Sequence, residues 1–100
     1  MQYTVKGDTA TFYLAGELDH AASAQVRDAL DQVITENRGV RHLVLDMNRL
    51  SFMDSSGIGV ILGRYKRMAQ RGGDVAVRNT APAVDRILLM SGIYTIVRKA

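Results

Sequence analysis

The chain has 100 residues, which suits one folded domain, and its 47% hydrophobic and 23% charged residues are typical of a globular protein. It has no cysteine, which excludes disulfides, thiolate chemistry and cysteine-ligated metals, and no apolar run approaches the roughly 20 residues of a membrane span. The net charge of +3 is spread along the chain, often beside acidic residues, and does not form a nucleic-acid-binding patch.

Hydrophobic periodicity and turn residues predict eight elements in the order β-β-α-β-α-β-α-β. The first two strands form a hairpin around a tight turn at Gly7 and Asp8, and the alternation that follows is typical of a parallel sheet with right-handed crossovers. In chain order, the predicted elements span residues 3–6, 9–15, 20–36, 40–46, 58–69, 74–78, 81–90 and 93–97.

Capping residues mark the predicted helix ends. Residues 16–19 break the second strand, and Asp19 is a candidate N-cap for the helix that follows. Thr80 is the corresponding candidate for the last helix, with the only proline of the chain close behind it. Gly39 suits a left-handed position after the first helix, and glycines at 72–73 end the second.

The central stretch, residues 43–67, begins as an apolar strand and ends as an amphipathic helix. We expect the strand to be buried on both faces, because Leu43, Val44 and Leu45 are consecutive. One helical face is predicted to carry the apolar residues Ile58, Ile61, Leu62, Tyr65, Met68 and Ala69. The outer face is predicted to carry the basic residues Arg64, Lys66, Arg67 and Arg71.

Two acid-bearing loops are predicted to lie at one edge of the sheet. In parallel sheets, binding sites lie beyond the carboxyl ends of the strands, where residues 16–20 and 53–57 both fall. Asp54, Ser55 and Ser56 stand where a helix begins, so their oxygens can cap it and a negative charge would be tolerated there. Two interpretations remain open: a capped helix start with a spare hydroxyl, or a functional hydroxyl.

Catalytic and cofactor motifs are missing. The loop does not match the G-x-S-x-G elbow of hydrolases, and His20 and His42 are more typical of capping or surface positions. Neither histidine has metal-ligand spacing around it, and there is no P-loop. Residues 57–63 place the third glycine of a dinucleotide fingerprint one position late. Gly59 and Gly63 are therefore interpreted as positions of close helix packing, against a neighbouring backbone or a partner.

A family resemblance favours the functional interpretation of the loop. Gly-Glu-Leu-Asp-His at 16–20 and the long stretch Leu-Ser-Phe-Met-Asp-Ser-Ser-Gly-Ile-Gly-Val-Ile-Leu-Gly-Arg-Tyr-Lys at 50–66 closely resemble the bacterial anti-sigma factor antagonists of the STAS family. Among these, the chain most resembles the sporulation anti-sigma factor antagonists of spore-forming Firmicutes. Shorter matches at 41–42, 81–84 and 90–93 extend the resemblance over nearly the whole chain.

The resemblance implies a single STAS domain over residues 1–100, with a mixed, mainly parallel sheet of four or five strands and helices mainly on one face. It also implies a regulator and not an enzyme. The unphosphorylated form binds an anti-sigma factor that is also a serine kinase, and so releases the sigma factor. The kinase phosphorylates the first serine after the loop aspartate, here Ser55, and a serine phosphatase restores the active form. Spacing alone does not choose between Ser55 and Ser56.

The expected partner-binding residues lie in the two loops and on the following helix. They are Glu17, Asp19, His20, Asp54, Ser55, Ser56, Gly57, Gly59 and Arg64. No cofactor, metal, nucleic acid or membrane partner is expected. With no cysteine and no signal-peptide pattern at the N-terminus, we expect a cytoplasmic protein. The alternative is a small-molecule or nucleotide-binding STAS module. Family members usually carry a further C-terminal helix, for which this sequence has no counterpart.

Overall fold

The computed structural model describes all 100 residues and has the predicted order of strands and helices. A short 3₁₀ turn, η1, is the only added element. The bounds are β1 Gln2–Lys6, β2 Thr9–Leu18, α1 His20–Glu36, β3 His42–Met53, α2 Ser55–Gln70, β4 Asp74–Arg78, α3 Pro82–Met90, η1 Ile93–Thr95 and β5 Arg98–Lys99.

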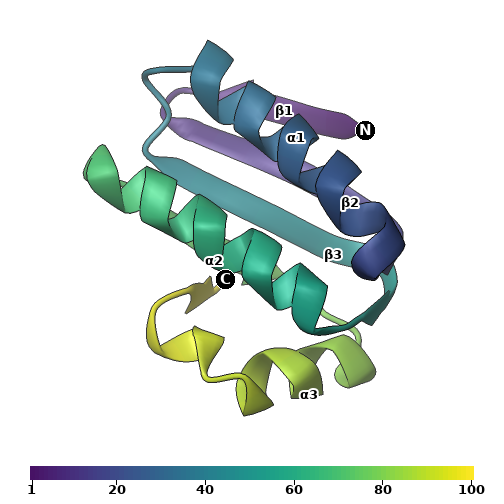
Figure 1. Ribbon diagram of the computed structural model, residues 1–100. Coiled ribbons are helices and arrows are strands. Elements are labelled where there is room, and N and C mark those ends of the chain that lie inside the picture. The colour runs from purple at the N-terminus through teal and green to yellow at the C-terminus, as the bar shows by residue number, and fades with distance from the viewer.

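The five strands form one sheet in the order β1-β2-β3-β4-β5. β1 pairs with β2 as an antiparallel hairpin, whereas the later strands are parallel to one another. All three helices pack on the same face of this sheet, with α1 and α2 side by side across β2 and β3 (Figure 1). The predicted α/β architecture, with a mainly parallel sheet and helices on one face, is therefore confirmed.

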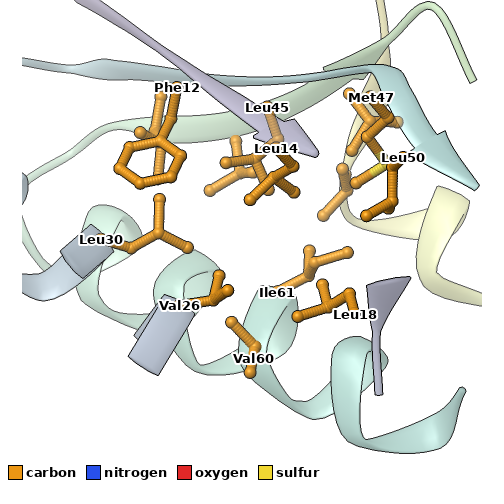
Figure 2. Close-up of a cluster of buried hydrophobic side chains, with 14 of the residues drawn as sticks. Phe12, Leu14, Leu18, Val26, Leu30, Leu45, Met47, Leu50, Val60 and Ile61 are labelled. Atoms are coloured by element: carbon orange, nitrogen blue, oxygen red, sulfur yellow. The ribbon is translucent and has the colours of Figure 1, made fainter. Parts of the chain in front are cut away.

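One core lies between the sheet and the helices. Alternate side chains of the strands, such as Phe12 and Leu45, point toward Leu30 of α1 and Ile61 of α2 (Figure 2). The run from Leu43 to Met47 is buried throughout, as predicted for a central strand. The far face of the sheet carries no helix, so its buried carboxylate, Asp46, lies outside this core.

Both central strands are longer than predicted. β2 continues through residues 16–18, and β3 continues through residues 47–53, which the sequence pattern assigned to loops. The pairing of these extensions is irregular, with register shifts between Tyr13 and Ala15 and between Gly16 and Glu17. In β3 the core positions after Met47 are Leu50 and Met53, a spacing of three that hides the period of two expected of a strand.

Two predictions near the C-terminus are wrong. The N-cap of α3 is Ala81, without a side-chain cap, because the Thr80 hydroxyl donates instead to Asp85 at 3.1 Å. Residues 93–97 do not form the last strand. Gly92 takes a left-handed conformation with φ 81°, which begins η1, and strand pairing resumes only at β5. Ile93 and Val97 are buried in the structure, as they would be in a strand. Their apolar character therefore could not distinguish a strand from a 3₁₀ turn.

The apolar face of α2 is also rotated from the predicted one. Ile61 and Met68 are buried as expected, but Leu62 is only half-buried and Ala69 is exposed. Other positions are turned inward instead: Gly57, which lies against Leu18 and Met53 of the strands, and Val60 and Arg64 are buried. Ile58 and Leu62 form the other edge of the stripe, where they line a shallow groove with η1.

Candidate functional site

The starts of α1 and α2 are capped in the same way. The Asp19 Oδ1 atom accepts a hydrogen bond from the backbone N–H of Ala22 at 2.9 Å. The Asp54 Oδ1 atom accepts one from the N–H of Ser56, also at 2.9 Å. Each carboxylate therefore satisfies a donor that the first helical turn leaves free, and its charge is favourable beside the positive end of the helix. Both predicted roles as N-caps are confirmed.

Strand pairing brings these two helix starts together. Leu18 and Met53 are neighbours in the parallel register of β2 and β3, and the Asp54 N–H donates to the Leu18 carbonyl at 3.3 Å. Across the gap, the Ser56 Oγ lies 3.5 Å from the His20 Nδ1. The two helices consequently begin at the same edge of the sheet (Figure 1). This is the edge that the sequence predicted for the acid-bearing loops.

Ser55 and Ser56 have different surroundings at this edge. Ser55 is the first residue of α2, is exposed, and its hydroxyl takes part in none of the side-chain hydrogen bonds of the structure. Ser56 is half-buried, with its N–H bonded to the cap and its hydroxyl beside His20. Of the two hydroxyls, that of Ser55 is the more accessible to another protein.

Three acidic residues lie at the same edge of the sheet as Ser55. Asp54 precedes it, Asp19 caps the neighbouring helix, and the exposed Glu17 is two residues before Asp19 on β2. A negative group attached to Ser55 would lie at the favourable end of α2 but among these like charges. A charge added to Ser55 would therefore leave both helix caps intact and would make the electrostatic potential at this surface more negative.

The glycines of α2 do not act alike. A Cβ on Gly57 would lie 2.7 Å from the Met53 Cγ and 2.9 Å from the Leu18 Cγ, so this buried position closes the helix onto the sheet. Gly59 and Gly63 would meet nothing within 4 Å. The interpretation of these two as close packing contacts within the fold is wrong. Gly59 is exposed, so α2 has no side chain at this surface position one turn after Ser55.

Arg64 is not on the outer face of α2, where the sequence placed it. Its side chain is only 10% exposed and lies against α1, with Nε 3.1 Å from the Asp31 Oδ1. That approach lacks hydrogen-bond geometry, and Nε and Nη1 are buried without an acceptor. Burial lowers the pKa of Arg64, although the charge of Asp31 opposes this. Arg67 binds the same Asp31 oxygen at 2.9 Å, so the pair holds α1 against α2.

Of the predicted binding residues, the structure gathers at this edge Glu17, Asp19, His20, Asp54, Ser55, Ser56 and Gly57, and it places Gly59 just beyond on α2. It does not bring Arg64 to them. Sequence reasoning gave no role to Phe52 and Arg49 at the end of β3, both of which are exposed. The apolar spacing of three from Met47 to Leu50 to Met53 was the available signal that this segment is a bulged strand.

Other kinds of site have less support. No group of three or more histidine, cysteine or acidic side chains is placed to hold a metal ion. No helix of the structure combines the length and the apolar character that crossing a bilayer requires. A pocket of about 220 Å³ lies beside the candidate site, between β1, β2 and α1, with Arg49 and Glu17 in its lining. It is smaller than the usual ligand pocket of roughly 300–1,000 Å³.

Comparison with known proteins gives one family. The STAS domain model matches residues 1–99. The chain is 52% identical over 83 residues to an anti-sigma F factor antagonist of Paenibacillus polymyxa, which is 83% of this chain and 70% of that protein. It is 34% identical over 89 residues to an antagonist of the same name in Lysinibacillus sphaericus, covering 89% and 75% of the two chains.

Solved structures agree with this result. The anti-sigma factor antagonist SpoIIAA in its unphosphorylated form matches with a TM-score of 0.84 at 34% identity, over 99% of this chain and 86% of that one. The phosphorylated form of SpoIIAA from Bacillus matches with a TM-score of 0.74 at 33% identity, over 99% and 89%.

Proposed function

Because the chain belongs to the STAS domain family and is an anti-sigma factor antagonist, we propose that it acts as a switch whose phosphorylation site is Ser55. The unmodified form binds an anti-sigma factor that is also a serine kinase, and binding releases the sigma factor. The kinase transfers phosphate to Ser55 and tight binding ends. A serine phosphatase removes the phosphate and restores the antagonist.

One observation carries the choice of residue. The Ser55 hydroxyl is exposed and free of hydrogen bonds, whereas Asp54 already caps the helix through Ser56. A kinase can therefore reach Ser55 without breaking any contact that holds α2 in place. The phosphate adds a charge of about −1.5 to −2 at pH 7, at a helix end that favours anions. The fold persists, and the change acts on the partner.

Phosphate would oppose binding because it must be desolvated. Glu17, Asp19 and Asp54 already make this edge acidic, and a further charged group there has to lose its hydration when a partner covers the edge. In this proposal the binding surface consists of the two capped helix starts, with His20, Ser56 and Gly57, and the smooth side of α2 at Gly59. Arg64 supports that surface from beneath by fixing α1 against α2.

Residues 1–100 act as one regulatory domain that performs no catalysis and works in the cytoplasm beside the transcription machinery. The competing function is a STAS module that binds a nucleotide or another small molecule, for which the pocket beside Glu17 would be the site. The two functions differ in what the isolated protein does with ATP.

The deciding experiment incubates the protein with radiolabelled ATP, with and without the purified anti-sigma kinase of the same organism. We expect phosphate only when the kinase is present, and mass spectrometry should place it on Ser55. Ser55→Ala should take up no phosphate yet still bind the kinase, and the matched control Ser56→Ala should be phosphorylated.

Phosphate found on Ser56 would refute the residue assignment. Saturable nucleotide binding by the protein alone, with no uptake of phosphate from the kinase, would favour the small-molecule module instead.

A further inference from the structure

Phe52 is a large apolar side chain that the fold leaves exposed. It stands near the end of β3 and is 45% exposed, although Leu50, two residues before it, and Met53, directly after it, are buried. Its cross-strand neighbour in β2 is Glu17, so no apolar side chain covers it from that strand. Its ring also has no aromatic partner, since the one ring pair of the structure joins Tyr3 and Phe12.

A bulge in β3 turns Phe52 outward. Leu50 points into the core, and ordinary alternation would bring the side chain two residues later into the core as well. Instead, Leu50 pairs with Gly16 and Phe52 pairs with the next residue, Glu17, so Ser51 is the extra residue. Met53 consequently takes the inward position. Bulges of this kind re-aim side chains at the rims of binding sites.

The bulge is stabilised by its own hydrogen bond. The Ser51 hydroxyl donates to the Gly16 carbonyl at 3.0 Å, so the side chain of the extra residue bonds the backbone of β2 beside the irregular pairing. Gly16 itself has φ 78°, a conformation that favours glycine. The outward direction of Phe52 is thus held by the strand pair and does not depend on a mobile loop.

The position of Phe52 links it to the candidate site. Only Met53 and Asp54 separate it from Ser55, so the two Cα atoms lie within about 10 Å even for an extended chain. The other exposed large apolar side chains lie at the N-terminus, on β1 or near the C-terminus and are Met1, Tyr3, Val5, Leu89, Met90 and Ile96. Lone exposed apolar residues are common on proteins, but this one is held outward by a bulge beside the modification site.

Two charged residues near Phe52 in the strand pair have no ionic partners. Glu17 lies opposite Phe52, and Arg49 lies three residues before it, and neither takes part in any ion pair of the structure. An apolar centre with a polar rim is the usual anatomy of a protein interface, in which aromatic residues and arginine are enriched. The rim also has both signs of charge, which suits a protein partner better than a nucleic acid.

We propose that Phe52 is an aromatic anchor of the antagonist, received by an apolar pocket on the anti-sigma factor. This inference rests on the function proposed above and names a contact that the switch surface uses. Glu17 and Arg49 meet charges of opposite sign around that pocket. Phosphate on Ser55 then acts a few residues from the anchor, where added charge prevents the close approach that burying the ring requires.

The experiment compares Phe52→Ala with the matched control Leu89→Ala, which truncates an apolar side chain that is 65% exposed and lies far along the chain on α3. Binding to the purified anti-sigma factor is measured by calorimetry, and thermal melts check the fold. We expect Phe52→Ala to weaken binding by about 30-fold or more, with little change in the melting temperature. Leu89→Ala should bind like the unaltered protein, and Phe52→Tyr should retain most of the affinity.

Three results would overturn the anchor. Affinity of Phe52→Ala within about threefold of the unaltered protein would remove its role, and so would equal losses for Leu89→Ala. Unfolding of Phe52→Ala would assign the ring to the core. Binding and phosphorylation of the unaltered protein distinguish these outcomes from failure of the proposed function. If it binds the anti-sigma factor and is phosphorylated on Ser55, only the anchor fails; if it does neither, the anchor falls with the proposed function.

Discussion

Ser55 has a free hydroxyl at a helix start whose cap is supplied by the residue before it. The two roles belong to different residues: Asp54 caps the helix, and Ser55 can be modified without loss of that cap. A charge at Ser55 should therefore leave the fold intact and alter only what binds there.

Ser55→Asp tests that separation. A carboxylate at the first position of α2 suits the positive end of the helix, so the melting temperature should match that of the unaltered protein. Affinity for the anti-sigma factor should fall by about tenfold or more, which corresponds to roughly 1.4 kcal/mol. The control is Ser55→Asn, similar in size but uncharged. Equal affinities for the two variants would mean that charge is not what ends binding.

At the scale of elements, α2 shows how packing against two neighbours shifts a helical face. The buried face of α2 packs against the sheet and α1, and the side of the helix with Ile58 and Leu62 faces η1. Residues one position apart on this helix consequently differ in burial: Ile61 is fully buried and Leu62 is half-buried.

The pair Ile61→Ala and Leu62→Ala measures this difference. Ile61→Ala leaves a cavity in the core and should lower the free energy of unfolding by about 2–5 kcal/mol. Leu62→Ala should cost clearly less, because solvent and the shallow groove already border its side chain. Urea denaturation of both variants gives the comparison. A larger loss for Leu62→Ala would contradict the orientation of α2.

These elements also show what the sequence could predict. The order of elements, both aspartate caps and the shared sheet edge follow from local patterns and from parallel pairing, and all are present. The extensions of β2 and β3 do not follow, because a bulge replaces the period of two with a spacing of three. The burial of Arg64 depends on Asp31, which is more than thirty residues away in the sequence. A local pattern cannot indicate such a contact.

For the whole molecule, three carboxylates link stability to pH. On the face of the sheet without helices, Asp46 is buried; burial would raise its pKa, but hydrogen bonds from the Asn48 N–H, Arg78 and Asn79 lower it. The pKa of Asp74 is lowered in the same manner, with His42 and Arg98 as donors opposing its burial. At the C-terminal end, the hydrogen bond from Tyr94 lowers the pKa of Asp85 most, with Lys99 contributing.

A lowered carboxyl pKa means that the folded state prefers the ionised form. These groups therefore stabilise the fold above their unfolded pKa, near the ordinary value of 3.8, and the contribution is lost as the pH falls through the lower folded values. The free energy of unfolding should be nearly flat from pH 7 to 5 and should drop below about pH 4. Urea denaturation across this range tests the prediction, and Asp46→Asn should make the acid slope shallower. An equally steep slope in that variant would exclude Asp46 as a cause.

The order of strands in the sheet is also the order of strands in the chain. Each new strand finds its partner in the one made just before it, and no strand waits for a distant segment to arrive. During synthesis, the hairpin of β1 and β2 can form first and serve as the template on which every later β-α unit is added in turn. Such neighbour-to-neighbour assembly keeps contact order low for a parallel sheet, which favours fast folding as the chain leaves the ribosome.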